Sequence, residues 1–189
     1  MYGEEISYEI SLVKSSDKKL FELFSCGNIS LDKYIKSEIF EESSLVNPDG
    51  LHFKVTTETN GKIVVIGFFS LATSGIIHRV ENYSHIFPSI KIDVFAIDKN
   101  YQKLHYDKAS ETAENPDDHY YFSDDIMGQV IRHCRKINDE YVLSDYVILY
   151  ADKNALRFYH RNMFEDYTEF MEPEQNQEVK KLYPMFFTL

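Results

Sequence analysis

The pattern of apolar and polar residues predicts four strands in the first half of the chain. Residues 6–12 alternate between apolar and polar side chains, which is the period of a strand with one buried face. Residues 51–57 and 62–71 are predicted as two further strands, joined through Asn60-Gly61, a strong hairpin signal. Residues 73–89 show no regular period. Residues 90–102 then form an apolar run typical of a buried central strand that ends at a turn.

Apolar residues three and four positions apart predict the helices. A first helix is expected to begin at a cap among residues 15–17, and Ser30 is expected to cap a second. A third begins at residues 123–125 and a fourth covers residues 154–162. Three shorter strands are expected at residues 145–151, 167–171 and 180–189.

These elements predict one α/β or α+β layered domain over residues 1–189, with a central mixed sheet and helices on both faces. The chain shows no repeat and no internal linker, and its 189 residues suffice for one substantial core. Residues 103–122 differ from the rest, because they carry five acidic residues and two lysines without a convincing period. We therefore expect a mobile acidic loop there.

Charge and cysteine content limit the partners and the compartment. The formal net charge of −11 repels polyanions, so nucleic acid is a disfavoured partner unless a local basic patch overrides the mean. The two cysteines lie far apart in sequence and no signal peptide precedes them, which predicts reduced thiols in a cytoplasmic protein. The longest apolar run, residues 63–72, is far short of a membrane span.

The end of the strand at residues 90–102 is the first place to look for a ligand. In open α/β sheets, ligands bind beyond the carboxyl ends of strands. Asp98, Lys99 and Asn100 provide turn chemistry there, and Tyr101 and Gln102 follow.

Three local patterns, in this order, resemble the GNAT family of N-acetyltransferases over most of the chain. Residues 24–28 (Phe-Ser-Cys-Gly-Asn) and 31–35 (Leu-Asp-Lys-Tyr-Ile) are similar to the opening helix pair of the branch that contains aminoacyl-tRNA-acetylating toxins. Residues 95–98 (Phe-Ala-Ile-Asp) with residues 101–102 (Tyr-Gln) resemble the strand and turn that lead into the acetyl-CoA loop. Residues 154–164 resemble the helix after the fifth strand.

The resemblance implies direct transfer of an acetyl group from acetyl-CoA to a primary amine. The pantetheine arm would lie between two splayed parallel strands, residues 90–102 and 145–151. Tyr159 would protonate the leaving thiolate, and Asn154 would be a further cofactor-binding residue. Taken without the resemblance, Phe158-Tyr159 is interpreted as a core aromatic pair of an amphipathic helix. Backbone groups that would hold the thioester belong to Phe95, Ala96 and Ile97.

The phosphate-binding part of the family pattern is interrupted in this chain. The family has glycines two and often four residues after a Gln or Arg, opening into a helix whose N–H groups and dipole bind phosphate. Here Gln102 is followed by Lys-Leu-His-Tyr, and Gly128 matches the last small residue, so about twenty residues are inserted. Asp124 and Asp125 either repel the phosphates or simply stabilise the helix N-terminus. The N–H groups that would face the phosphates are those of Ile126, Met127, Gly128 and Gln129.

No residue identifies the general base or a metal site. Asp93, Glu38, Glu41 and His105 are candidates for the base by position, and a solvated or hydrogen-bonded polar role explains each of them as well. The histidines show no metal-ligand spacing with cysteines or carboxylates, so we expect no metal.

The sequence therefore predicts an acetyl-CoA-dependent N-acetyltransferase whose acceptor is a polyamine, a protein lysine or N-terminus, or an aminoacyl-tRNA. The net charge favours a cationic acceptor, while a modest basic cluster at residues 132–136 leaves tRNA open. The alternative is a GNAT fold that has lost cofactor binding and serves as an interaction module. A toxin neutralised by a partner is a third hypothesis, a homodimer is compatible with the sequence, and no membrane partner is expected.

Overall fold

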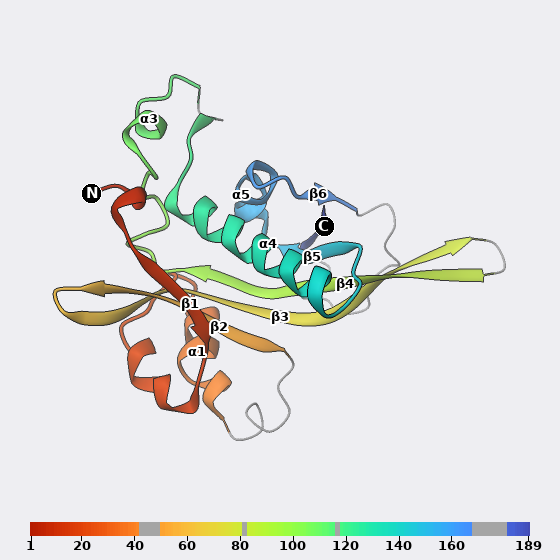
Figure 1. Cartoon of the computed structure of the whole chain (residues 1–189), viewed down its shortest axis with the longest axis horizontal. Helices are drawn as coiled ribbons and strands as arrows, with labels where there is room; N and C mark the ends of the chain where they lie inside the picture. The colour runs from red at the N-terminus through yellow and green to blue at the C-terminus, as the bar shows by residue number, and fades with distance from the viewer. Residues whose placement is uncertain (42–49, 81–82, 116–117, 168–180) are drawn as a thin grey trace. The chain divides into compact units, whose positions relative to one another are not determined.

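The computed structural model describes residues 1–41, 50–80, 83–115, 118–167 and 181–189 (Figure 1). Its strands are β1 (Tyr8–Leu12), β2 (Leu51–Thr59), β3 (Lys62–Val80), β4 (Tyr83–Ile97), β5 (Tyr146–Ala151), β6 (Glu165–Asp166) and β7 (Tyr183–Thr188). Its α-helices are α1 (Ile29–Lys36), α3 (Lys108–Glu111), α4 (Phe122–Glu140) and α5 (Leu156–Arg161). Short 3-10 helices are η1 (Gly3–Glu5), η2 (Ser15–Phe21), η3 (Glu38–Phe40) and η5 (Lys153–Ala155).

The strands form a mixed sheet in the order β1-β2-β3-β4-β5-β7-β6. β1 pairs with β2, and β2 with β3, in antiparallel register. β4 and β5 are parallel, from Ser89 opposite Tyr146 to Ile92 opposite Leu149. β7 is antiparallel to both of its neighbours, β5 and β6. This mixed sheet with helices confirms the predicted fold class, including the parallel pair, and β4 runs on to Ile97 beyond the last pair of the parallel ladder.

The chain divides into two compact units. The first comprises Met1–Leu71 and Val94–Asp125, and the second comprises Ala72–Asp93 and Ile126–Leu189. β3, β4 and α4 each contribute residues to both units. The single domain predicted from the sequence stays a prediction.

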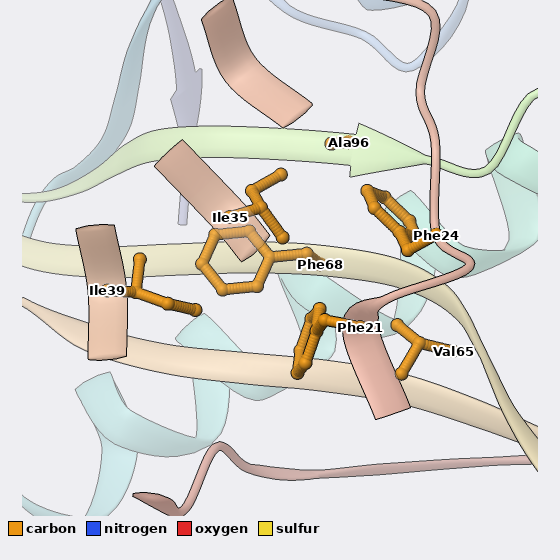
Figure 2. Packing of buried hydrophobic residues seen from close by; sticks show 7 residues of the cluster. All are labelled: Phe21, Phe24, Ile35, Ile39, Val65, Phe68 and Ala96. Carbon is orange, nitrogen blue, oxygen red and sulfur yellow. The ribbon is translucent and has the colours of Figure 1, made fainter. Parts of the chain in front are cut away.

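Aromatic side chains fill the core of the first unit (Figure 2). Phe21 is fully buried, and its ring meets those of Phe24 and Phe68 edge to face, with centroids 6.3 and 6.1 Å apart. Burial of each such side chain contributes about 1.5–3 kcal/mol. The cluster consists of Phe21 and Phe24, Ile35 of α1, Ile39 of η3, Val65 and Phe68 of β3, and Ala96 of β4. The apolar faces predicted for the first two helices therefore pack on strands of their own unit.

The core of the second unit is built around β5. Val147, Ile148 and Leu149 are all buried, which is expected for a strand covered on both faces. The ring of Phe187 on β7 contacts Phe164 at 5.6 Å, and the guanidinium of Arg135 on α4 lies 5.4 Å from the same ring. α4 contributes the buried side chains of Val130, Ile131 and Cys134 to this unit.

The hairpin predicted at Asn60-Gly61 is confirmed. Both residues have positive φ, 52° and 72°, as a type I′ turn requires. The structure corrects the prediction that residues 73–89 are irregular, because β3 continues to Val80 and β4 starts at Tyr83. Gly75 suggests a break, yet a Cβ there would lie 3.0 Å from the Ile86 side chain, so glycine serves a close approach between strands.

Smaller corrections concern element ends. Asn28, and not Ser30, caps α1, since its side chain accepts the N–H of Leu31 at 3.1 Å. The first predicted helix is the 3-10 helix η2. A strand was predicted at 167–171, of which residues 168–171 lie outside the described residues, and β6 covers Glu165–Asp166 just before it. Within the described chain, every helix is too short or too polar to span a bilayer.

Candidate functional site

The predicted turn at the end of β4 is held by the buried carboxylate of Asp98. Its Oδ1 accepts the backbone N–H of Asn100 at 3.0 Å and the side-chain amide of the same residue at 2.8 Å. Its Oδ2 accepts the N–H of Ser25 at 2.9 Å. The Asp98 N–H donates to Ile66 O on β3. Only 5% of Asp98 is exposed, so this carboxylate fixes where the strand stops.

Gln102, predicted to bind the cofactor, is held by backbone carbonyls in this structure. Its Nε2 donates to Ile97 O and to Cys26 O, both at 2.8 Å. Both amide hydrogens thereby join the end of β4 to the loop before α1. Phe95, Ala96 and Ile97, predicted to hold a thioester, form the last three residues of β4.

The loop before α1 is organised by Asp32, a residue to which the sequence assigned no role. Its Oδ2 accepts the hydroxyl of Ser25 and its Oδ1 the N–H of Cys26, both at 2.7 Å. Partial burial raises the pKa of Asp32, but these hydrogen bonds outweigh it and the net pKa is lowered. Gly27 has φ +88°, a conformation that favours glycine. The Phe-Ser-Cys-Gly-Asn pattern is thus explained by local geometry beside the end of β4.

Neither cysteine offers a thiolate at neutral pH. Burial raises the pKa of Cys26 to about 11 and that of Cys134 to about 12. Since the thiolate is the nucleophile, this geometry does not favour an acyl-cysteine intermediate.

α4 begins at Phe122, four residues before Ile126, the first residue whose N–H was predicted to face the phosphates. Ile126, Met127, Gly128 and Gln129 lie in its second turn, where each N–H of an α-helix bonds the carbonyl four residues back. The donors at the end of the helix belong instead to the first turn, Phe122 to Asp125.

Three of the four N–H groups in the first turn of α4 donate hydrogen bonds to carbonyl oxygens of the chain itself. The N–H of Phe122 donates to Leu104 O at 2.8 Å, and the N–H groups of Asp124 and Asp125 donate to Tyr121 O at 2.9 and 3.4 Å. Asp124 is 1% exposed, and its Oδ2 accepts the Tyr121 N–H at 2.8 Å, as in a capping box. A phosphate here would meet two carboxylates, at a cost of about 1–4 kcal/mol per close pair of like charges. These residues do not fit the diphosphate that the resemblance places at this helix end.

The described part of residues 103–122 contains regular secondary structure that the sequence did not predict. They contain α3, whose cap Asp107 accepts the Ser110 N–H, and a bridge pairs His105 with Tyr121. The N–H of Gly3 donates to His105 O at 2.9 Å, which joins η1 to this segment. The acidic loop predicted at residues 103–122 therefore contains a short helix and a bridge, and its mobility stays a prediction.

A cleft of about 870 Å³ lies in the first unit, beside Tyr101, the first residue after the Asp98–Asn100 turn. Tyr8 and Tyr101 line it, together with the carboxylates of Glu5, Glu9 and Glu58. The cleft is therefore acidic, which suits a cation better than an anion.

Tyr159, the predicted proton donor, lies in α5 of the second unit. It is 8% exposed, and its ring contacts Phe158 and Phe164 edge to face at 5.1 and 5.7 Å. Burial raises the pKa of Tyr159 to about 12, so the phenol stays protonated at neutral pH. Asn154, predicted to bind the cofactor, is exposed in η5, and its N–H donates to Asp152 Oδ1 at 2.8 Å.

The candidate bases have structural partners. Asp93 pairs with Lys91 at 2.5 Å and Glu38 with Lys33 at 2.9 Å. The His105 ring packs on that of His119, with centroids 5.3 Å apart, and Glu41 is exposed. Across the described ranges, no group of three or more metal-ligating side chains is present.

No protein-family model and no curated protein matches the chain. Several solved structures do. A "bacterial toxin" shares 18% identity with a TM-score of 0.66 and covers 97% of this chain and 91% of its own. A tyrosine-to-phenylalanine mutant of KacT shares 14% at a TM-score of 0.67, covering 96% and 94%. AtaT complexed with acetyl-methionyl-tRNAfMet shares 13% at 0.65, covering 96% and 95%. At such identity the likeness shows the fold, which agrees with the resemblance to the GNAT toxin branch.

Proposed function

We propose that the protein is an N-acetyltransferase that transfers the acetyl group of acetyl-CoA to a primary amine. The observation that carries the proposal is the likeness of fold over nearly the whole chain. Among the similar structures, AtaTR is bound with AcCoA, shares 14% identity at a TM-score of 0.67, and covers 96% of this chain and 93% of its own. The proposal is also supported by the parallel pairing of β4 and β5, because the resemblance assigns the cofactor to such a pair.

Tyr159 is the proposed proton donor for the leaving thiolate. Its phenol is neutral in its buried setting, so it has a proton to give at neutral pH. The main chain of Phe95 to Ile97 is proposed to orient the thioester carbonyl. The acceptor amine attacks that carbonyl, the C–S bond breaks, and the thiolate takes the proton of Tyr159. The proton that the amine nitrogen loses restores the neutral phenol, so protons balance over one turnover.

A cationic amine is the acceptor class that the chain supports best. The net charge of −11 and the glutamates of the cleft beside Tyr8 and Tyr101 attract cations. Aminoacyl-tRNA is the competing acceptor, because AtaT was solved with acetyl-methionyl-tRNAfMet. Incubation of the protein and acetyl-CoA with spermidine, a lysine peptide and methionyl-tRNA, followed by mass spectrometry, distinguishes them by which one gains an acetyl group.

A second candidate function is favoured by the closed first turn of α4. A GNAT fold that cannot seat a donor would act as an interaction module. Calorimetry with acetyl-CoA and with a shorter acetyl thioester separates the two candidates. Absence of heat with both donors at high micromolar concentration contradicts the enzyme, whereas binding that persists in Tyr159→Phe while turnover falls supports it.

A toxin role for this activity is supported by the same neighbours, several of which are toxins and one of which is bound to the C-terminus of the antitoxin AtaR. Expression of the wild-type chain is then expected to arrest growth. The Tyr159→Phe variant, produced at the same level, is expected to allow growth. Equal growth with both chains contradicts a toxin that acts through Tyr159.

A further inference from the structure

The N-terminal end of α4 is buried beneath the chain's own N-terminal segment. Phe122 is fully buried, and its ring packs on Tyr8 and Tyr101 with centroids 5.5 and 6.1 Å apart. A Cβ on Gly3 would lie 2.9 Å from Phe122 Cβ, so η1 lies directly against the start of the helix. The Gly3 and Glu4 N–H groups hold η1 there by bonding His105 O and Tyr106 O at 2.9 and 2.8 Å.

Carboxylates of the protein also offset the positive partial charge at the start of α4. Asp124 bonds back to the Tyr121 N–H, and the carboxylate of Asp125 accepts the Tyr8 hydroxyl at 2.5 Å. Two carboxylates in the first turn interact favourably with the helix dipole. Three of the four first-turn N–H groups thus donate to carbonyls of the chain, and two carboxylates offset the positive potential that normally makes a helix N-terminus an anion site.

We infer that the start of α4 excludes the diphosphate of the acetyl donor, so that the donor is recognised through its acyl-pantetheine part and the nucleotide adds no affinity. The identity of the donor rests on the proposed function. Asp125 and the capping residue Asp124 are the residues that determine this specificity. The substrate class that follows is an acetyl thioester of pantetheine, with or without a nucleotide.

Three ligands separate the parts of the donor in calorimetric titrations of the full chain. These are acetyl-CoA, S-acetylpantetheine and ADP, the last serving as a probe of the nucleotide diphosphate without the acyl-pantetheine part. The two thioesters are expected to bind with dissociation constants within about threefold of each other, and ADP is expected not to bind at millimolar concentration. Acetyl-CoA binding more than about tenfold tighter than S-acetylpantetheine, or ADP binding at micromolar concentration, overturns the inference.

The salt dependence of acetyl-CoA binding shows whether the diphosphate lies near negative or positive charge. Repulsion between the first-turn carboxylates and a nearby diphosphate is screened by salt, with a Debye length of about 10 Å at 0.1 M. Acetyl-CoA binding is therefore expected to stay constant or to tighten as salt rises. A dissociation constant that increases steeply with salt contradicts the inference, because it indicates a cationic phosphate site.

Asp125→Asn is the sharpest variant, since an amide oxygen still accepts the Tyr8 hydroxyl while the charge is lost. The expected result is about threefold tighter binding of acetyl-CoA and unchanged binding of S-acetylpantetheine. Asp139→Asn is the matched control, because it removes the same charge from an exposed position in the last turn of the same helix. Equal effects of both variants overturn the role of Asp125.

The ADP titration decides the inference even if the proposed function fails. Should neither thioester bind, the acetyltransferase proposal falls. Absence of ADP binding then still supports exclusion of the diphosphate, and tight ADP binding still refutes it.

Discussion

The hydroxyl of Tyr8 donates a hydrogen bond to Oδ2 of Asp125 across 2.5 Å. Tyr8 begins β1, and Asp125 lies in the first turn of α4, 117 residues later in the chain. The bond therefore ties the start of the helix to the edge of the sheet within the first unit. It also fixes a carboxylate at the helix end that the GNAT resemblance assigns to phosphate.

Removal of the Tyr8 hydroxyl is expected to destabilise the protein. Tyr8→Phe keeps the ring contact with Phe122 but loses a hydrogen bond to a charged group, which contributes about 1.5–3 kcal/mol. The free energy of unfolding in urea measures the loss. Tyr141→Phe is the control, because that side chain is exposed. If the two variants are equally stable, the Tyr8 bond contributes nothing.

The ion pair between Lys54 and Asp17 is expected to contribute to stability in a pH-dependent way. The Lys54 Nζ lies 2.6 Å from Asp17 Oδ2, and both side chains are largely buried. Burial raises the pKa of Asp17, but the hydrogen bonds from Lys54 and from the Lys14 N–H outweigh it, so the net pKa falls below its ordinary value. A carboxyl group whose pKa is lowered in the folded state stabilises the protein above its unfolded-state pKa, and this contribution disappears as the pH falls through the folded-state pKa.

The test is a comparison of wild type with Asp17→Asn. At neutral pH the variant is expected to be less stable by about 2 kcal/mol, because Lys54 remains buried without its charged partner. The gap is expected to narrow as the pH falls below about 4. A gap that is constant between neutral and acidic pH contradicts the role of the Asp17 charge.

Asp98 is expected to be the most sensitive position at the end of β4. Asp98→Ala leaves the part-buried N–H of Ser25 and both donors of Asn100 without this acceptor, at an expected cost of about 2–3 kcal/mol. Asp98→Asn retains one acceptor oxygen and is expected to cost less. Thermal unfolding measures both, with the exposed Asp139→Ala as control. An Asp98→Ala variant as stable as Asp139→Ala refutes the role of this carboxylate.

Local signals in the sequence predicted much of the fold. The Asn60-Gly61 hairpin depends only on the backbone freedom of two residues, and the buried β5 depends on one apolar run. The extension of β3 through residues 73–80 and of β4 through residues 83–89 was not predictable, because each strand is stabilised by the other and Gly75 suggests a break. Tertiary pairing overrode local propensity there.

The candidate site was predicted only in part. The turn at Asp98 follows from its residue types, but the bond from Ser25 to Asp98 spans 73 residues and leaves no local signal. The start of α4 was placed too late because Ser-Asp-Asp suggests a cap at residue 123, whereas Asp124 acts as the third helical residue and bonds back to Tyr121. Sequence patterns show which residues can cap, and the structure shows which one does.

Tyr159 is expected to leave the alkaline side of the pH-rate profile flat. Burial raises its pKa to about 12, so the phenol keeps its proton up to about pH 10, where an ordinary tyrosine titrates. Turnover is expected to rise with pH as the acceptor amine deprotonates, and then to level off. A fall in turnover near pH 10 that persists when the acceptor is varied contradicts a buried neutral phenol as the acid.

Amine-dependent thiol release from an acetyl thioester is the direct test of acetyl transfer with Tyr159 as the proton donor. Wild type and Tyr159→Phe are compared with acetyl-CoA and with S-acetylpantetheine, after urea unfolding has shown equal stability. Wild type is expected to release thiol with either donor, and Tyr159→Phe is expected to do so at a rate at least about 10²-fold lower. Equal rates for the two proteins, or no amine-dependent release by wild type with either donor, contradict acetyl transfer with Tyr159 as the proton donor.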